Sequence, residues 1–247
     1  MANFHSRSNS FPSQSHPIVN DVEDHLRRLR ASESTSTSAT SICANLASLR
    51  NLHECINNMT QMPSIQQSLS NEQSQNWINE LLEGSLRLVD LCDFSRDVAC
   101  LTKDSVQDLE SSMRRNRCET ATSDDIKAHM ASGKKINKMV NKYIKNLKSF
   151  NQNSTELPQT EFGTTLQETE RLAFSVLKSA LTLMSGEKEK SKQRSWSMLS
   201  KFTQTNRVHS ELNDLCSFDI QDVEEGLESL FRSLIKTRVS LLNVISH

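Results

Sequence analysis

The sequence NWINELLEGSLRLVDLCDFSRDVACLTKDSVQDLESSMRRNR, residues 76–117, decides the fold class of this chain. It contains no proline and a single glycine, Gly84. Residues seven apart lie on the same side of a helix, and counting in sevens from Ile78 or from Leu81 meets mostly small or apolar side chains. At 1.5 Å per residue, an unbroken helix here would run roughly 60 Å. The stretch therefore predicts one long helix that serves as a spine for other helices.

The composition of the whole chain agrees with a helical fold. The 247 residues are 35% hydrophobic and only 5% aromatic, with five glycines and four prolines. Sheet proteins use runs of Val, Ile and aromatic residues with Gly-rich turns, and such runs are missing here. We therefore expect an all-α, elongated helical bundle built around one long spine helix, with a disordered N-terminal tail.

The chain is expected to divide into a tail and one helical domain. Residues 1–40 form a Ser-rich tail that is disordered except for one short amphipathic helix, from Asp21 to about Ala31. Residues 41–247 form the helical bundle domain. Apolar stripes at three- and four-residue steps predict its other helices beside the spine. These helices run from near Ser41 to Pro63, from Ser123 to about Leu147, from about Thr164 to Met184, and from near Asp219 to Ile245.

Three features of the spine lead to more local expectations. Gly84 costs about 1 kcal/mol relative to Ala inside a helix, so a neighbouring helix is expected to approach closely at this position. Arg87 and Asp90 are three residues apart, as are Asp93 and Arg96. Both pairs are predicted to form surface ion pairs that contribute little to stability.

Charge and cysteine usage narrow the classes of function. The formal net charge is −1, so the molecule as a whole is not drawn to polyanions, and aromatic platforms for stacking on bases are scarce. Nucleic acid is therefore a poor candidate partner. None of the six cysteines forms a C-x-x-C pair, and no secretory or membrane-spanning segment is evident. We expect free, mostly buried thiols, no metal or other cofactor, and an intracellular protein, cytoplasmic before nuclear or plastid.

Standard enzyme motifs do not occur in the sequence. There is no G-x-S-x-G, Walker loop, G-x-G-x-x-G or H-E-x-x-H. Five scattered glycines also provide no phosphate-cradling loop. We expect a non-enzyme with no catalytic residues, and an all-helical enzyme without a standard motif is the open alternative.

The N-terminal tail carries one motif with a chemical reading, RSNSFP at residues 7–12. Arg7 lies three residues before Ser10, as basic-directed kinases prefer, and Pro12 follows two residues later. Phosphorylation of Ser10, with Ser8 beside it, would create a ligand of the kind that 14-3-3-type phosphoserine readers bind. The alternative is a tail that is never modified.

A second candidate site is a basic helical face. Lys134, Lys138 and Lys142 recur every four residues, and Lys145 extends the same face. Such an amphipathic helix could contact an anionic membrane surface or an acidic partner protein. The alternative is an exposed helix whose lysines keep the bundle soluble and are partly balanced by the acidic start of the last helix.

Three blocks of sequence together resemble a known family. They are HSRSNSFPSQSHP at residues 5–17, WINELLEGSLRLVDLCDFSRD at 77–97 and VEEGLESLFRSLIKTRVSLLNVIS at 223–246. In this order they resemble the plant-specific family of unknown function that is related to the BYPASS proteins. The resemblance implies a plant protein with a helical fold and, for some relatives, a part in root and shoot development. It assigns no catalytic or binding residues.

These observations favour a non-catalytic interaction or regulatory protein in plant development or signalling, with a tail that phosphorylation could regulate. The alternative is a peripheral membrane protein that uses the Lys-rich helix.

Overall fold

A computed structural model of the chain describes the residues in the ranges 17–33, 38–71, 75–115, 123–150, 160–185 and 208–246. Within these ranges all regular structure is helical. The helices are α1 (Pro17–Ser32), α2 (Ala39–Thr60), α3 (Pro63–Asn71), α4 (Gln75–Arg115), α5 (Ser123–Phe150), α6 (Glu161–Met184) and α8 (Val208–Ile245). The all-α fold class is therefore confirmed.

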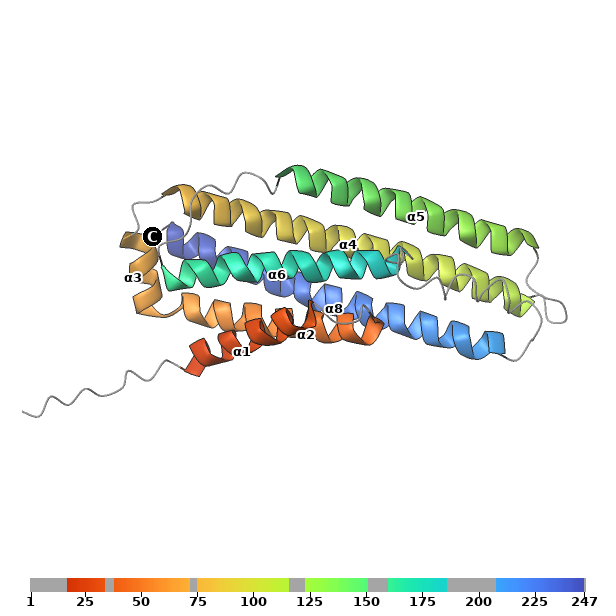
Figure 1. Cartoon of the computed structure of the whole chain (residues 1–247), viewed down its shortest axis with the longest axis horizontal. Coiled ribbons are helices and arrows are strands. Elements are labelled where there is room, and N and C mark those ends of the chain that lie inside the picture. Colours follow the sequence, from red (N-terminus) through yellow and green to blue (C-terminus); the bar gives the residue numbers. More distant parts are fainter. Residues whose placement is uncertain are drawn as a thin grey trace, which may run out of the picture.

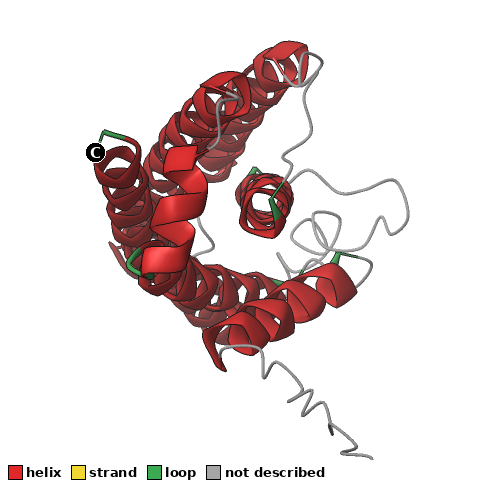
Figure 2. Ribbon diagram, turned by 90° about the vertical axis from the view of Figure 1, so that its left-hand side faces the viewer, coloured by secondary structure: helices red, strands yellow, loops and turns green. Residues whose placement is uncertain are grey.

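The helices form an elongated bundle. All except the short α3 run along the long axis of the molecule (Figure 1). Viewed from the end, α5, α4, α8, α2 and α1 follow one another along an arc, each packed on the next (Figure 2). Helix α6 lies on the inner side of this arc, where it contacts α4, α2 and α1. The concave side of the arc is therefore where distant parts of the sequence meet.

The predicted spine is confirmed as α4, which has 41 residues and packs against α5, α6 and α8. Its predicted stripe is buried in the first half of the helix, with Ile78, Leu88 and Cys92 at 6%, 3% and 0% exposure, and half-buried farther along at Val106 and Leu109. Helix α8 supplies the opposing face through Leu227, Leu230 and other side chains. One continuous apolar core therefore runs along the bundle, because the stripes on α2, α4, α6 and α8 all face inward.

Local capping explains where two of the helices begin. The Ser38 hydroxyl accepts a hydrogen bond from the Ser41 amide at 3.1 Å and caps α2. Thr160 caps α6 in the same way, accepting from the Gly163 amide at 3.2 Å. Both helices therefore start two or three residues before the positions predicted from periodicity.

Two parts of the helical pattern differ from the expectation. Pro63 was expected only to end a helix, but it also occupies the first position of α3, where its missing N–H and fixed φ are tolerated. The last helix begins at Val208 rather than near Asp219. Residues 208–218 contain no Gly or Pro to interrupt it, so the acidic residues after Asp219 do not mark its first turn.

Helix α1 packs against α2 and α6. Its apolar edge is the predicted one, and Val22, Leu26 and Leu29 are buried to 5% exposure or less. The predicted bundle domain begins at residue 41, but α1, which precedes it, also contributes side chains to the core. Helix α1 begins at Pro17 rather than Asp21, and α2 already includes residues 39–40, so these parts of the predicted disordered tail are helical. Residues 1–16 and 34–37 of that tail lie outside the described residues.

Candidate functional site

The structure places the predicted lysine face on the outer side of α5. This helix buries Ile136 and Val140 at 7% and 0% exposure and stacks Tyr143 on Phe94 of α4, with ring centroids 3.9 Å apart. Because the lysines lie opposite this buried edge, all of them point into solvent. The exposed residues are Lys134, Lys138, Lys142 and Lys145.

These four lysines, which we call the lysine face, have no ion-pair partner in the described part of the chain. In the alternative interpretation the acidic start of α8 partly balances these lysines, but no ion pair joins the two in the described part of the chain. Glu224 pairs with Lys103 at 2.7 Å, and Glu228 pairs with Arg96 at 2.5 Å, both on α4. The acids of α8 reach α4 rather than α5 because α4 lies between α5 and α8 in the arc (Figure 2).

The other predicted site, Arg7, Ser8, Ser10 and Pro12, lies outside the described residues. The tail motif therefore stays a prediction.

A groove that the sequence analysis did not predict lies between α1, α4 and α6 on the concave side of the arc. It has a volume of about 1030 Å³. Leu26, Trp77, Leu81 and Phe174 provide apolar lining, and charged residues from all three helices surround them. We call it the α1–α4–α6 groove.

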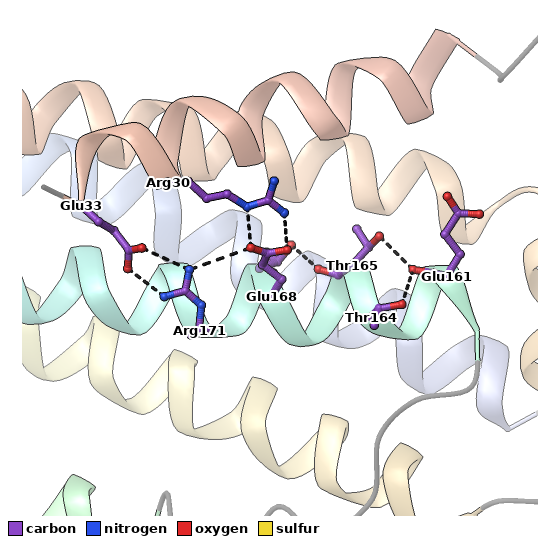
Figure 3. Close-up of polar contacts among 8 residues, drawn as sticks. Arg30, Glu33, Glu161, Thr164, Thr165, Glu168 and Arg171 are labelled. Carbon is purple, nitrogen blue, oxygen red and sulfur yellow. Dashed lines mark hydrogen bonds and ion pairs between the residues drawn. The ribbon is translucent and has the colours of Figure 1, made fainter.

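Ion pairs tie α1 to α6 along one edge of this groove. Arg30 donates to both carboxylate oxygens of Glu168, one of them at 2.6 Å, and Arg171 donates to Glu33 at 3.0 and 3.2 Å. Figure 3 shows the two arginines on either side of Glu168. The hydrogen bond from Arg30 lowers the pKa of Glu168, and that from Arg171 lowers the pKa of Glu33. The edge is therefore ionised and internally paired.

Glu170, which lines the groove, lies directly against Gly84 of α4. A Cβ atom at Gly84 would overlap the Glu170 carboxyl group, so the absence of a side chain on α4 makes room for a carboxylate from α6. The close approach expected at Gly84 is therefore present, but a side chain makes it rather than a helix backbone. Burial raises the pKa of Glu170 to about 7, against the opposing effect of Arg87, whose guanidinium lies 3.9 Å away. Asp93 and Arg96 form the predicted ion pair at 2.8 Å, whereas Arg87 pairs with Glu170.

A second polar group is buried in the core, between α2 and α8. The Thr237 hydroxyl donates to the Ser233 carbonyl at 3.0 Å, so it accepts from His53 Nδ1 at 3.1 Å. This arrangement leaves His53 Nε2 buried without a partner in the described residues, and burial lowers the pKa of His53 to about 4. The site is a buried neutral histidine.

The described cysteines are free thiols, but they are less buried than expected. Cys92 is buried and donates to the Leu227 carbonyl at 3.6 Å, while Cys43 and Cys55 are half-buried and Cys100 is exposed. Burial raises the pKa of Cys92 to about 12. Within the described ranges no three His, Cys, Asp or Glu residues are grouped closely enough to hold a metal ion. No described helix has an apolar stretch long enough to cross a lipid bilayer.

Sequence reasoning missed the groove because its residues come from three helices far apart in the chain. The only local signal was Gly84, a residue that weakens a helix and so indicates an approach by another group. The lysine face, by contrast, lies on a single helix and was found from spacing alone.

Comparison with known proteins gives the family. No curated protein and no solved structure matches the chain. A family model described as Protein BPS1 matches residues 45–219 and 205–244. These ranges include all of α2 except its first turn and a half, together with α3, α4, α5, α6 and nearly all of α8. Because the match covers most of the chain, the protein belongs to the BPS1 family, the BYPASS-related plant family, and this membership suggests a role in plant development.

Proposed function

We propose that this protein is a non-catalytic interaction protein of plant development that binds an acidic partner protein through its lysine face. The observation that carries the proposal is the exposure of four lysines without ion-pair partners in the described chain. From Lys134 to Lys145 the face is roughly 16 Å long at 1.5 Å per residue. A partner helix that presents Asp or Glu at three- and four-residue steps matches it in charge and spacing.

The arrangement of α5 supports this role. The helix lies at the end of the arc and packs mainly on α4, so its outer face is not covered by another described helix. Substituting the lysines would remove charge without opening the core, because Ile136 and Val140 hold the opposite side. Binding and folding therefore use different faces of α5.

A quantitative affinity purification from plant tissue tests the proposal. The bait variants are Lys134→Gln/Lys138→Gln/Lys142→Gln/Lys145→Gln and a control, Arg232→Gln/Lys236→Gln, which removes exposed positive charge from α8. We expect the α5 variant to lose a set of acidic proteins that the wild type and the control retain. Equal recovery by all three baits would contradict a partner site on α5.

The second candidate is a peripheral membrane protein that uses the same face on anionic lipid, where each lysine contributes about 1 kcal/mol near the surface. The regular row of exposed charges favours it. Against it, Met130 is the only large apolar side chain exposed among the side chains of α5 that the structure describes, so these offer little that could insert between lipids. Flotation with vesicles of phosphatidylserine and phosphatidylcholine distinguishes the two. Binding that disappears with salt or in the α5 variant would favour the membrane.

We further propose that the tail regulates the protein. Phosphorylation of Ser10 would supply the charge and acceptors that a 14-3-3-type reader binds, with Arg7 directing the kinase and Pro12 turning the chain away. Phosphorylated and unphosphorylated tail peptides are compared in a pull-down from plant extract. Ser10→Ala should abolish capture, Ser8→Ala should weaken it less, and Ser10→Asp should not restore it. Equal capture by both peptides would overturn the switch.

A further inference from the structure

The α1–α4–α6 groove has an excess of negative charge. Six glutamates and four arginines line it. All four arginines already have an acidic partner: Arg27 pairs with Asp24, Arg30 with Glu168, Arg87 with Glu170, and Arg171 with Glu33. The groove therefore has no unpaired cation among its described lining residues.

Several acids of the groove are unpaired. Glu80 and Glu83 on α4 form no ion pair within 4.0 Å with any residue of the described ranges, and the same holds for Glu23 on α1 and Glu161 on α6. Glu170 is only partly compensated, since Arg87 is 3.9 Å away and the charge of Glu80 adds to the rise in its pKa. A cation entering the groove would therefore find carboxylates that lack a full partner.

The floor of the groove is apolar and includes an unsatisfied donor. Leu26, Trp77 and Leu81 are buried to 8% exposure or less, and Phe174 is half-buried beside them. Trp77 Nε1 is buried and has no acceptor in the described part of the chain. Buried indole N–H groups normally have a partner, and the carbonyl of a bound ligand could supply one here.

We propose that the α1–α4–α6 groove binds a short basic peptide segment of a partner protein. Its Lys or Arg side chains pair with Glu80, Glu83 and Glu170, its apolar side chains pack on the floor, and a backbone carbonyl is available to Trp77. A peptide combines the three chemistries that the groove presents: cation, apolar side chain and acceptor. The α4 lining from Trp77 to Arg87 runs about 15 Å, the length of four or five extended residues.

This site is separate from the lysine face. It lies on the inner side of the arc and selects a positively charged ligand, whereas the lysine face lies on the outer side of α5 and selects a negative one. A protein with both surfaces can connect two partners of opposite charge.

Fluorescence anisotropy with a labelled hexapeptide of alternating Arg and Leu tests the proposal on the full-length protein. Glu80→Gln/Glu83→Gln is expected to weaken binding about fivefold or more, as the loss of two partly exposed charge pairs predicts. The control, Asp104→Asn/Asp108→Asn, removes two exposed acids from the same helix outside the groove and should bind like wild type. Because Glu83 is exposed, the single variant Glu83→Gln should fold like wild type. It should still bind the peptide more weakly than wild type, with a smaller loss of affinity than the double variant.

Three further arms identify the ligand and the site. A peptide with Glu in place of Arg should not bind, and spermine should compete only weakly because it has no apolar side chain or carbonyl. The α5 variant without the lysine face should bind the Arg-Leu peptide as wild type does, so failure of one proposal is distinguishable from failure of the other. Equal binding by the groove and control variants, binding of the Glu peptide, or full competition by spermine at the affinity of the peptide would overturn the proposal.

Discussion

Helices α5 and α8 are both long and amphipathic, yet they have opposite places in the molecule. Helix α8 packs against α2, α3 and α4 and buries Val223, Leu227, Leu230, Leu234 and Leu241. Helix α5 packs mainly on α4, and its buried residues with described side chains are Ile136 and Val140. One helix lies at the middle of the arc and the other at its end.

The difference shows that the position of a helix in the bundle decides whether its polar side chains stabilise the fold or remain available to bind a partner. On α8 even polar side chains contact other helices, since Thr237 accepts a hydrogen bond from His53 of α2 and Glu224 forms an ion pair with Lys103 of α4. On α5 the lysines stay free because no described helix covers that side. We expect changes in α8 to act on folding and changes in the outer face of α5 to act on binding.

The largest expected effect on stability comes from placing a charge in the middle of the bundle. Leu234→Asp on α8, like Leu88→Asp on α4, places an unpaired carboxylate where the leucine is 3% exposed. Each should lower the free energy of unfolding by at least several kcal/mol and unfold or grossly destabilise the protein. Thermal melting followed by circular dichroism measures this. A melting temperature within a degree or two of wild type would mean that these faces are not buried together.

A milder truncation compares the two helices directly. Leu230→Ala on α8 should cost about 2–5 kcal/mol, because the side chain is fully buried between helices. Ile136→Ala on α5 should cost less, because the end of the arc can relax around it. Hydrogen exchange should show Leu230→Ala weakening protection throughout the bundle and Ile136→Ala weakening it in α5 alone. Equal global loss in both variants would show that α5 is as central as α8.

The buried histidine at the α2–α8 contact predicts a dependence on pH. Burial lowers the pKa of His53 from 6.5 to about 4. Between these values the unfolded chain binds a proton that the folded protein does not, so this group makes stability fall as the pH falls from 6.5 to 4. The loss amounts to about 3 kcal/mol.

Urea denaturation at pH 7 and pH 4.5 measures this contribution as a difference between wild type and His53→Gln. The variant should lose less stability on acidification than wild type. Glu170 acts in the opposite direction, since its raised pKa makes stability fall as the pH rises from 4.5 towards 7. Glu170→Gln is therefore the companion variant, and its stability should fall more steeply on acidification than that of wild type. If the stability of His53→Gln and of wild type depended on pH in the same way, His53 would not be the group responsible.

The smallest expected effect on stability comes from the lysine face. Lys134→Gln/Lys138→Gln/Lys142→Gln/Lys145→Gln should change the free energy of unfolding by no more than about 1 kcal/mol, because exposed residues without partners contribute little. The same denaturation experiment gives the value. A loss comparable to that of Leu230→Ala would mean that these lysines stabilise the fold, and the contrast between α5 and α8 would fail.

Much of the fold was predictable because an amphipathic helix produces a regular spacing of apolar residues within its own segment of the sequence. The first half of the stripe of α4, the apolar edge of α1 and the exposed row of lysines on α5 each follow from spacing within one segment, and the structure has them as expected. Met130 follows the apolar spacing of α5 but is 43% exposed. The misses are also local in origin. Pro63 is compatible with both ending one helix and beginning another, and acidic residues after Asp219 resemble a first turn although the helix starts earlier.

The sequence by itself determined most of the helices, the apolar side of each and the lysine face, since each depends on residues within a few turns of one another. Only the tertiary structure decided which faces are covered and which residues meet. It separated α5 from the acidic residues of α8 and placed Glu170 of α6 against Gly84 of α4. It also formed the α1–α4–α6 groove from three helices that are far apart in the chain. Periodicity reports which side of a helix is apolar, but it carries no information about which other helix that side contacts.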